Sequence, residues 1–483
     1  MIIASFLFFL AAFVVVGVSS YRRSSNTSRD YLLASSHVQP WLVALSAIAT
    51  NNSGYMFIGV IGFTYAVGWS SVWLMFGWIV GDFLASTFIH RRLREATERT
   101  GSETYAGLLS SWNGTDFRTL RRVAALISIL FLSAYAAAQL KAGSKALHVL
   151  FGWPEYLGAL IGAAIVLAYC LAGGLRASIW TDAAQSVVMI TAMAVLLFVA
   201  TADLGGPAAA LSQLNAVGPD YMNWFPHDLP LGAPLGPVLF VVGWLFAGFS
   251  VVGQPHVMVR FMALDDARHM TRARAYYYSW FVAFYAMATA VGLLSRLLIP
   301  ESGTFDAELA LPTIALQLLP DALVGLILAG VFAATMSTAD SLLISCAGSL
   351  TDDLLDRSAL NVWLVKGATL LVTLFALGVA VTDSQSVFSL VIYAWAGLAA
   401  AFGPLLAVYA LGHRPGEKLA LTMMVSGVLL VFAWKQVDGL GDFYEGTLAI
   451  VAGFLIFLTG RALGLDQQPE PSQRAERAEQ RPA

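Results

Sequence analysis

Thirteen apolar segments, most of them near 20 residues long, dominate this chain of 483 residues. A helix of about 20 apolar residues spans the hydrocarbon core of a bilayer. Only 12% of the residues are charged, roughly half the share of a soluble globular chain. The sequence therefore predicts an all-α polytopic membrane protein with about 13 transmembrane helices. The segments cover residues 2–20, 38–66, 69–90, 121–148, 153–172, 179–202, 236–262, 276–299, 320–350, 361–382, 385–410, 417–435 and 443–462.

Arginine and lysine residues concentrate in alternate links between these segments, and cytoplasmic loops of membrane proteins are enriched in both. The basic links include residues 91–99, 118–122 and 260–274, with Arg260 at the start of the third. This pattern predicts an N-terminus outside and a C-terminus in the cytoplasm. We expect a multi-pass protein of the plasma membrane, which in a bacterium is the inner membrane.

The ninth segment, residues 320–350, carries polar residues where an apolar helix would face hydrocarbon. Polar groups at membrane depth are costly and usually functional. Ala334, Ser337 and Thr338 have the spacing i, i+3 and i+4, so they share one helix face. Hydroxyl and carbonyl oxygens suit a hard cation, and this face can offer both. The alternative is that the hydroxyls bond to carbonyls of their own helix.

Two other segments contain polar interruptions near their centres. The second segment holds Thr50-Asn51-Asn52-Ser53-Gly54, and the seventh holds Gly253-Gln254-Pro255-His256. Non-helical backbone survives at membrane depth only where it faces a cavity or a ligand. The interruptions lie five helices apart, which predicts two five-helix units of opposite orientation, as in transporters with broken helices. Simple proline and glycine kinks are the alternative.

Several motifs resemble the sodium:solute symporter family, in particular its sodium/proline symporter branch. They are AATMSTADSLLISCAGSLTDDL in the ninth segment, GWLFAGFSVVGQPHVMVRFMA in the seventh, GGLRASIWTDAAQ, VIYAWAGLAAAFGPLL and FAWKQVDGLGDFYE. The resemblance implies a LeuT-like 5+5 inverted repeat and sodium-coupled uptake of a small organic solute by alternating access. Proline is the favoured solute, with another amino acid or small carboxylate as alternatives.

The same resemblance implies a domain organisation. Residues 1–37 would form a first helix and a cytoplasmic link, and 38–410 the ten-helix transport core. Residues 411–463 would add two helices, and 464–483 a disordered cytoplasmic tail rich in proline, glutamine and glutamate.

Residue by residue, the family's sodium site falls on five positions. Its backbone carbonyls match Ala49, Asn52 and Ala334, and its hydroxyls match Ser337 and Thr338. Asp182 matches a family aspartate near the inner end of the sixth helix, where a carboxylate could attract sodium as it leaves. Helix capping or a pair with Arg176 is an equal alternative for Asp182.

The chain also departs from the branch. Asn51 stands where the branch carries aspartate, which leaves open a lower sodium affinity or coupling to protons. If the seventh segment is aligned on Gly253–His256, the branch's pocket tryptophan and tyrosine fall on Ala247 and Val251. Alignment on Trp244 would keep the tryptophan but requires a three-residue insertion, so we prefer the first alignment.

Substrate-binding residues follow from the break in the second segment and from the resemblance. Free N–H groups at Ser53 and Gly54 would attract a carboxylate. The other candidates are Tyr55, Tyr135, Gln139, Ala247, Val251 and Pro255. Asp82, inside the third segment, is either a gating or coupling group or a capped, paired structural carboxylate.

Other function classes receive less support. Phosphate-binding-loop and hydrolase motifs are missing from the sequence, so we do not expect an enzyme. The expected partners are the solute, sodium and the lipid bilayer, with no further cofactor and no nucleic acid. A transporter-like membrane sensor acting with a partner kinase is the rival from another class.

Overall fold

A computed structural model describes residues 1–21, 27–229, 231–299, 305–355, 362–382, 386–434, 436 and 443–466. Its α-helices are α1 (Ile2–Tyr21), α2 (Ser28–Leu33), α3 (Pro40–Asn51), α4 (Ile61–Val67), α5 (Val72–Thr100), α6 (Tyr105–Ser111), α7 (Arg118–Phe151), α8 (Glu155–Asp203), α9 (Pro207–Leu214), α10 (Leu235–Phe249), α11 (Pro255–Met262), α12 (Met270–Leu298), α13 (Ala310–Leu318), α14 (Asp321–Gly348), α15 (Val362–Thr382), α16 (Val387–Ala410), α17 (Glu417–Trp434) and α18 (Gly446–Ala462). The predicted tail, residues 464–483, lies almost wholly outside the described residues.

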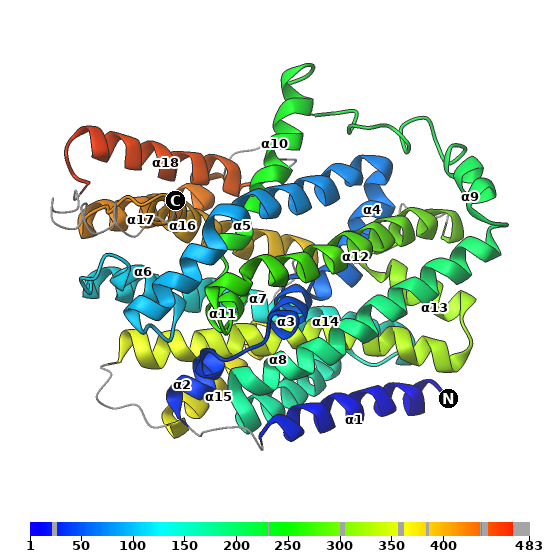
Figure 1. Ribbon diagram of the computed structural model, residues 1–483. Helices are drawn as coiled ribbons and strands as arrows, with labels where there is room; N and C mark the ends of the chain where they lie inside the picture. The colour runs from blue at the N-terminus through cyan, green and yellow to red at the C-terminus, as the bar shows by residue number, and fades with distance from the viewer. Residues whose placement is uncertain are drawn as a thin grey trace.

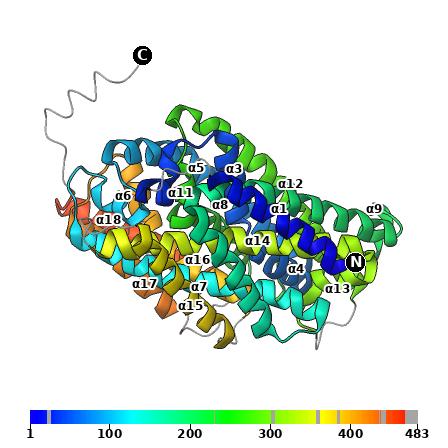
Figure 2. The ribbon, with the colours of Figure 1, turned by 90° about the horizontal axis from the view of Figure 1, so that it is seen from below.

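The long helices run side by side in one bundle, with α14 and α16 almost completely buried (Figure 1). Helix α14 packs on α7 and α8, and α1 covers α8 and α14 from outside. Helices α17 and α18 pack on α16 at another edge of the bundle. The N-terminus lies at the end that holds α9 and α13 in both views (Figures 1 and 2). The centre of the bundle therefore includes α14, the helix that carries the predicted hydroxyl face.

Helical structure coincides with every one of the thirteen predicted segments. Within the described residues, nine helices are long and apolar enough to cross a membrane. Others, such as Ile2–Gly17 and Gly446–Ala462, are shorter apolar helices. The all-helical architecture is as expected, and the count of thirteen spans stays a prediction.

One expected link is instead helical. The fifth and sixth segments join in α8, where Gly174 alone leaves helical dihedrals, at φ 56° and ψ −149°. A Cβ atom at this position would lie 2.6 Å from the Tyr31 side chain, so only glycine allows both the turn and the packing. The helix is interrupted at this single residue, and Asp182 lies in the helical stretch that follows it.

Both polar interruptions are true breaks in the helix. Helix α3 ends at Asn51, Asn52 has φ −90° and ψ 48°, and a π-helical turn follows from Tyr55 to Val60. Helix α10 passes through a 3₁₀ turn at Ser250–Gly253, and Gln254 is extended before Pro255 starts α11. Irregular turns of this kind inside helices are frequent at functional sites.

Candidate functional site

The broken end of α3 lies against α14, and two hydroxyls of α14 reach its carbonyls. The Ser337 hydroxyl donates to the Ala49 carbonyl at 3.2 Å and to the Ala334 carbonyl at 3.1 Å. The Thr338 hydroxyl donates to Thr50 O at 2.9 Å and to Ala334 O at 3.1 Å. The alternative in which each hydroxyl bonds to a carbonyl of its own helix is therefore present in the structure, and each hydroxyl also bonds across to α3, whereas the cation site stays a prediction.

Four of the five predicted sodium ligands meet in this way. Among the described residues, no hydrogen bond joins the Asn52 carbonyl to α14; the main-chain and side-chain N–H groups of Asn52 both donate to the Ile48 carbonyl. The carbonyl of Thr50 occupies the corresponding place beside Thr338. Thr50 also bonds through its hydroxyl to Ser341, at 3.0 Å. The result is a buried group of neutral oxygens, the ligand type that a monovalent hard cation accepts.

Asp182 lies at one side of this oxygen group and is fully buried. It accepts hydrogen bonds from Ser46 at 2.6 Å and Ser178 at 3.3 Å. Its charged partner is Arg260, whose Nη2 lies 3.4 Å from the carboxylate. Arg176 pairs with Asp30 instead, at 2.6 Å, so the alternative pairing of Asp182 with Arg176 was wrong. In this structure, the positive charge beside the Asp182 carboxylate is therefore the guanidinium of Arg260.

Arg260 was counted among the basic residues of a cytoplasmic link, and the structure corrects this assignment. Its side chain is completely buried in α11. Besides Asp182 it donates to the His256 carbonyl at 2.8 Å, to Ser178 at 2.9 Å and to the Ser341 hydroxyl. Ser341 in turn donates to Asp340 at 2.9 Å. A network of one arginine, two carboxylates and several hydroxyls therefore adjoins the sodium-site residues of α14.

At the break in α3, side chains of α7 already satisfy the backbone that was expected to be free. The Gly54 N–H donates to Gln139 Oε1 at 2.9 Å, and the Tyr135 hydroxyl donates to Ser53 Oγ at 3.0 Å. The Tyr55 N–H points to Ser53 Oγ at 3.2 Å. Of the two N–H groups expected to be free, that of Gly54 is therefore occupied in this conformation. A carboxylate could reach Gly54 only by displacing the amide oxygen of Gln139.

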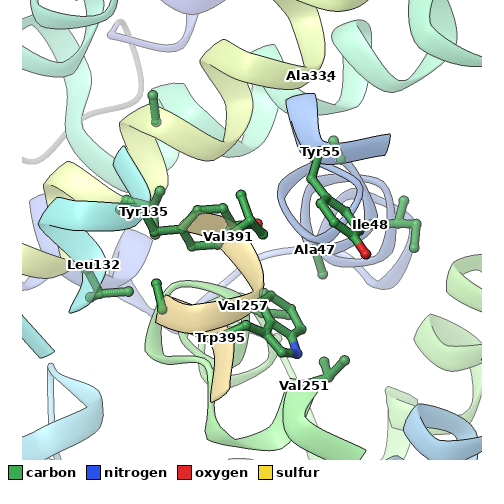
Figure 3. Close-up of a cluster of buried hydrophobic side chains, with 14 of the residues drawn as sticks. Ala47, Ile48, Tyr55, Leu132, Tyr135, Val251, Val257, Ala334, Val391 and Trp395 are labelled. Atoms are coloured by element: carbon green, nitrogen blue, oxygen red, sulfur yellow. The ribbon is translucent and has the colours of Figure 1, made fainter. Parts of the chain in front are cut away.

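Aromatic rings from several helices surround this break (Figure 3). Tyr55 stacks on Phe388 with ring centroids 5.3 Å apart and lies 5.6 Å from Trp78. Tyr135 meets Trp395 edge to face at 6.2 Å. Trp395 of α16 belongs to a motif, VIYAWAGLAAAFGPLL, that served only for the family resemblance. A large aromatic residue within a run of alanine and glycine was the signal that could have identified it.

Ala247 and Val251 are fully buried on the broken seventh segment, and Trp395 lies against both. Its indole N–H donates to the Ala247 carbonyl at 3.1 Å, and Figure 3 shows its ring beside Val251. The space left by two small side chains is therefore filled from α16. Trp244 lies 6.1 Å from Phe63 between ring centroids, and Phe63 stacks on Phe388 at 4.9 Å, so two rings separate Trp244 from Tyr55.

Among the described residues, no hydrogen bond or ring contact joins Pro255 to the aromatic side chains around the α3 break. It lines a separate cavity of about 20 Å³ with residues of α6 and α14, including Tyr105 and Ile344. Its neighbour His256 does reach the group, with its ring 5.4 Å from Tyr135 and 6.2 Å from Trp395. Pro255 acts here as the first residue of α11, where its missing N–H costs nothing.

A cavity of about 400 Å³, large enough for a small solute, opens where α7 and the first half of α8 meet the segment before α13. Lys145 lines it and lies 2.7 Å from Asp306 and 2.7 Å from Glu308. Glu308 accepts the N–H groups that begin α16, including that of Phe388 at 2.8 Å. By contrast, the cavity beside Gln139 measures only about 10 Å³, near the space of one water. Substrate binding next to Gln139 therefore requires the helices to separate.

Comparison with known proteins places these features in context. The sequence profile of the sodium:solute symporter family matches residues 31–427. The high-affinity proline transporter PutP of Bacillus subtilis is 30% identical over 453 residues, covering 92% of this chain and 94% of that protein. The sodium/proline symporter of Escherichia coli is 29% identical over 467 residues, covering 94% and 90%.

Solved structures support the fold. A Na⁺-coupled sialic acid symporter in a substrate-bound outward-open state superposes with a TM-score of 0.81 at 18% identity, covering 97% of this chain and 99% of that one. MhsT in complex with L-phenylalanine gives a TM-score of 0.54 at 13% identity, covering 87% and 98%. The expected LeuT-like fold, with its two broken helices, is confirmed.

Proposed function

This chain belongs to the sodium:solute symporter family, and from that premise we propose that it is a sodium-coupled importer of proline. The relatives that match over nearly its whole length are proline transporters by name. The family and these relatives are transporters rather than enzymes, and the chain is a multi-pass membrane protein. Taken with the basic residues of alternate links, we infer an N-terminus outside and a C-terminus in the cytoplasm.

The observation that carries the sodium assignment is the contact between the break of α3 and α14. Sodium would bind among the carbonyls of Ala49 and Ala334 and the hydroxyls of Ser337 and Thr338, with a carbonyl of the break, Asn52 or Thr50, as a further ligand. An ion held there joins a helix of the first five-helix unit to one of the second. It therefore favours conformations in which the two helices are in contact.

Proline would bind beside this ion, at the α3 break. Its carboxylate would take the Gly54 N–H from Gln139, at a helix start where the local dipole favours an anion. Its ring would lie among Tyr55, Tyr135 and Trp395, which form the aromatic wall. Because sodium and proline then favour the same arrangement of α3, each raises the affinity of the other by the same factor.

Asp182 would act on the path by which sodium leaves toward the cytoplasm, rather than as a ligand of the bound ion. Its carboxylate is paired with Arg260, so an ion leaving toward the cytoplasm would have to exchange with the guanidinium. Weak, exchangeable binding of this kind lets a transported ion depart. Arg260 thereby gains a role that its sequence position did not suggest.

The test is proline uptake by proteoliposomes containing the purified full-length protein. An inward sodium gradient should drive uptake, and replacement of sodium by potassium at a fixed membrane potential should abolish it. Protein-free liposomes are the control, and other amino acids added as competitors define the substrate range. Uptake that persists without sodium but follows a proton gradient would overturn the sodium assignment.

A further inference from the structure

A fully buried carboxylate, Asp82 of α5, has no role in the site described so far. One of its oxygens accepts the Tyr277 hydroxyl at 2.9 Å. Within the described residues its other oxygen, Oδ1, has no hydrogen-bond partner, and no basic side chain forms an ion pair with it. Arg274 of α12 lies nearby but donates to Ser86 at 3.0 Å and to the Phe83 carbonyl at 3.1 Å, both on α5. An unpaired carboxylate at membrane depth is costly and is a candidate functional group.

Tyr277 connects this carboxylate to the break of α3. The Tyr277 hydroxyl accepts a hydrogen bond from the Asn51 side-chain amide at 2.6 Å while it donates its own proton to Asp82. Asn51 directly follows Thr50, whose carbonyl accepts the Thr338 hydroxyl. Two hydrogen bonds therefore separate Asp82 from the last residue of α3. Asn51 Oδ1 is a second buried acceptor without a donor in the described part of the chain, and a surplus of acceptors favours a nearby cation.

The direction of these bonds explains why residue 51 is an amide. A tyrosine hydroxyl has one proton to donate, and Asp82 takes it. The group on the other side must then be a donor, which asparagine is and a carboxylate is not. Aspartate at position 51 would set two carboxylates against one hydroxyl proton in a buried environment, where like charges disfavour each other strongly. The chain can thus hold one negative charge in this network, at position 51 or at position 82.

We propose that Asp82 supplies a negative charge to the sodium-binding region in addition to the Asp182–Asp340–Arg260 network, and that Tyr277 and Asn51 couple it to the break of α3. The charge lies outside the ion's own ligands and acts through the low-dielectric interior, where electrostatic interactions are stronger than in water. Asp82 is therefore a positioning residue for the ion rather than a ligand. This inference rests on the proposed sodium-coupled function.

The experiment compares the purified wild type with Asp82→Asn, Tyr277→Phe, Asn51→Asp and the double variant Asn51→Asp/Asp82→Asn. Two quantities are measured: the sodium concentration for half-maximal proline uptake, and the shift of the melting temperature by sodium without proline. Glu95→Gln is the matched control, because Glu95 lies exposed on the same helix and its one ion pair within the described part of the chain is with Arg91, at 2.9 Å.

We expect Asp82→Asn to raise the half-maximal sodium concentration about tenfold, which corresponds to ~1.4 kcal/mol of lost attraction. Tyr277→Phe should also raise the half-maximal sodium concentration, because it removes the hydroxyl that joins Asp82 to Asn51 while the ring remains. Asn51→Asp alone should also impair sodium binding, and the double variant should return to within about threefold of the wild type. A carboxylate that served only to stabilise the fold would not give this reciprocal rescue.

Each outcome decides a different point. A wild type without any sodium response in either measurement overturns the proposed function and this inference together. A sodium-responsive wild type with an unchanged Asp82→Asn variant overturns the inference alone. So does a double variant no better than the worse single one. If Asp82→Asn does not fold, Tyr277→Phe and the comparison of Asn51→Asp with the double variant give the answer.

Discussion

Replacement of Thr338 by valine removes one hydroxyl of α14 and keeps the branched shape of the side chain. In the structure this hydroxyl donates to Thr50 O of α3 at 2.9 Å and to Ala334 O of its own helix at 3.1 Å. Only the first contact crosses between the two helices that would hold sodium. The variant therefore tests whether the hydroxyl is an ion ligand or merely bonds to its own helix.

The size of the effect follows from the chemistry of the lost group. A polar contact to a charged partner contributes about 1.5–3 kcal/mol, which corresponds to a rise of roughly 10- to 150-fold in the sodium concentration for half-maximal uptake. Loss of the contact to α3 in the absence of the ion costs only about 1 kcal/mol. The melting temperature without sodium should therefore fall slightly, while the stabilisation by sodium should fall strongly.

The assay is sodium titration of proline uptake in proteoliposomes at saturating proline and fixed membrane potential. Thr373→Val is the matched control, because the hydroxyl of Thr373 is buried in α15 and donates to the Thr369 carbonyl of its own helix at 2.7 Å. This control should leave the sodium titration unchanged. If the Thr338 and Thr373 variants have the same half-maximal sodium concentration, Thr338 is not a sodium ligand and the reasoning is refuted.

Three further predictions follow from the same geometry. Arg260→Met should destabilise the protein by about 3–5 kcal/mol, because Asp182 is left as a buried unpaired charge; adding Asp182→Asn should recover part of the loss in thermal unfolding, and a double variant as unstable as the single one would contradict the pairing. Trp395→Phe keeps a ring but loses the hydrogen bond to α10. The KM for proline at saturating sodium should therefore rise about five-fold, the effect of ~1 kcal/mol. An unchanged KM would show that Trp395 is not part of the aromatic wall that binds proline. Gly54→Ala would put a Cβ 2.5 Å from a methyl carbon of α14, so overpacking of about 1–3 kcal/mol should largely abolish transport. The control Gly367→Ala has open space around the new Cβ and should transport normally. Normal uptake by the Gly54 variant would show that the break tolerates a side chain.

The positions of the helices and of the breaks were predictable because they depend on local sequence. Apolar runs of membrane-spanning length predict helices, and the Asn-Asn-Ser-Gly and Gly-Gln-Pro groups predict where backbone hydrogen bonding is interrupted. The hydroxyls of Ser337 and Thr338 were predictable as one face of a helix from their spacing alone. The sodium-site prediction stands on these three local facts and on the family resemblance.

Other features of the candidate site could not be predicted because they join residues far apart in the sequence. Arg260 has the sequence context of a basic cytoplasmic link, and only packing shows that it is buried against Asp182. Gln139 was expected to bind substrate, but whether it leaves the Gly54 N–H free depends on how α7 meets the break. Trp395 lies beside Ala247, one of the two positions on which the alignment placed the branch's pocket aromatics, and no pattern in the sequence links these two residues.

Local sequence was therefore sufficient to predict a polytopic helical protein, two broken helices and a polar face on α14, since each depends on neighbours along one helix. Helix packing sets which oxygen meets which hydroxyl, and which carboxylate has a cation beside it. Asp82 is the clearest case: its link to Asn51 passes through Tyr277, a residue 195 positions away from it. Contacts of this kind are set by the packing of helices against one another, and no local pattern in the sequence encodes them.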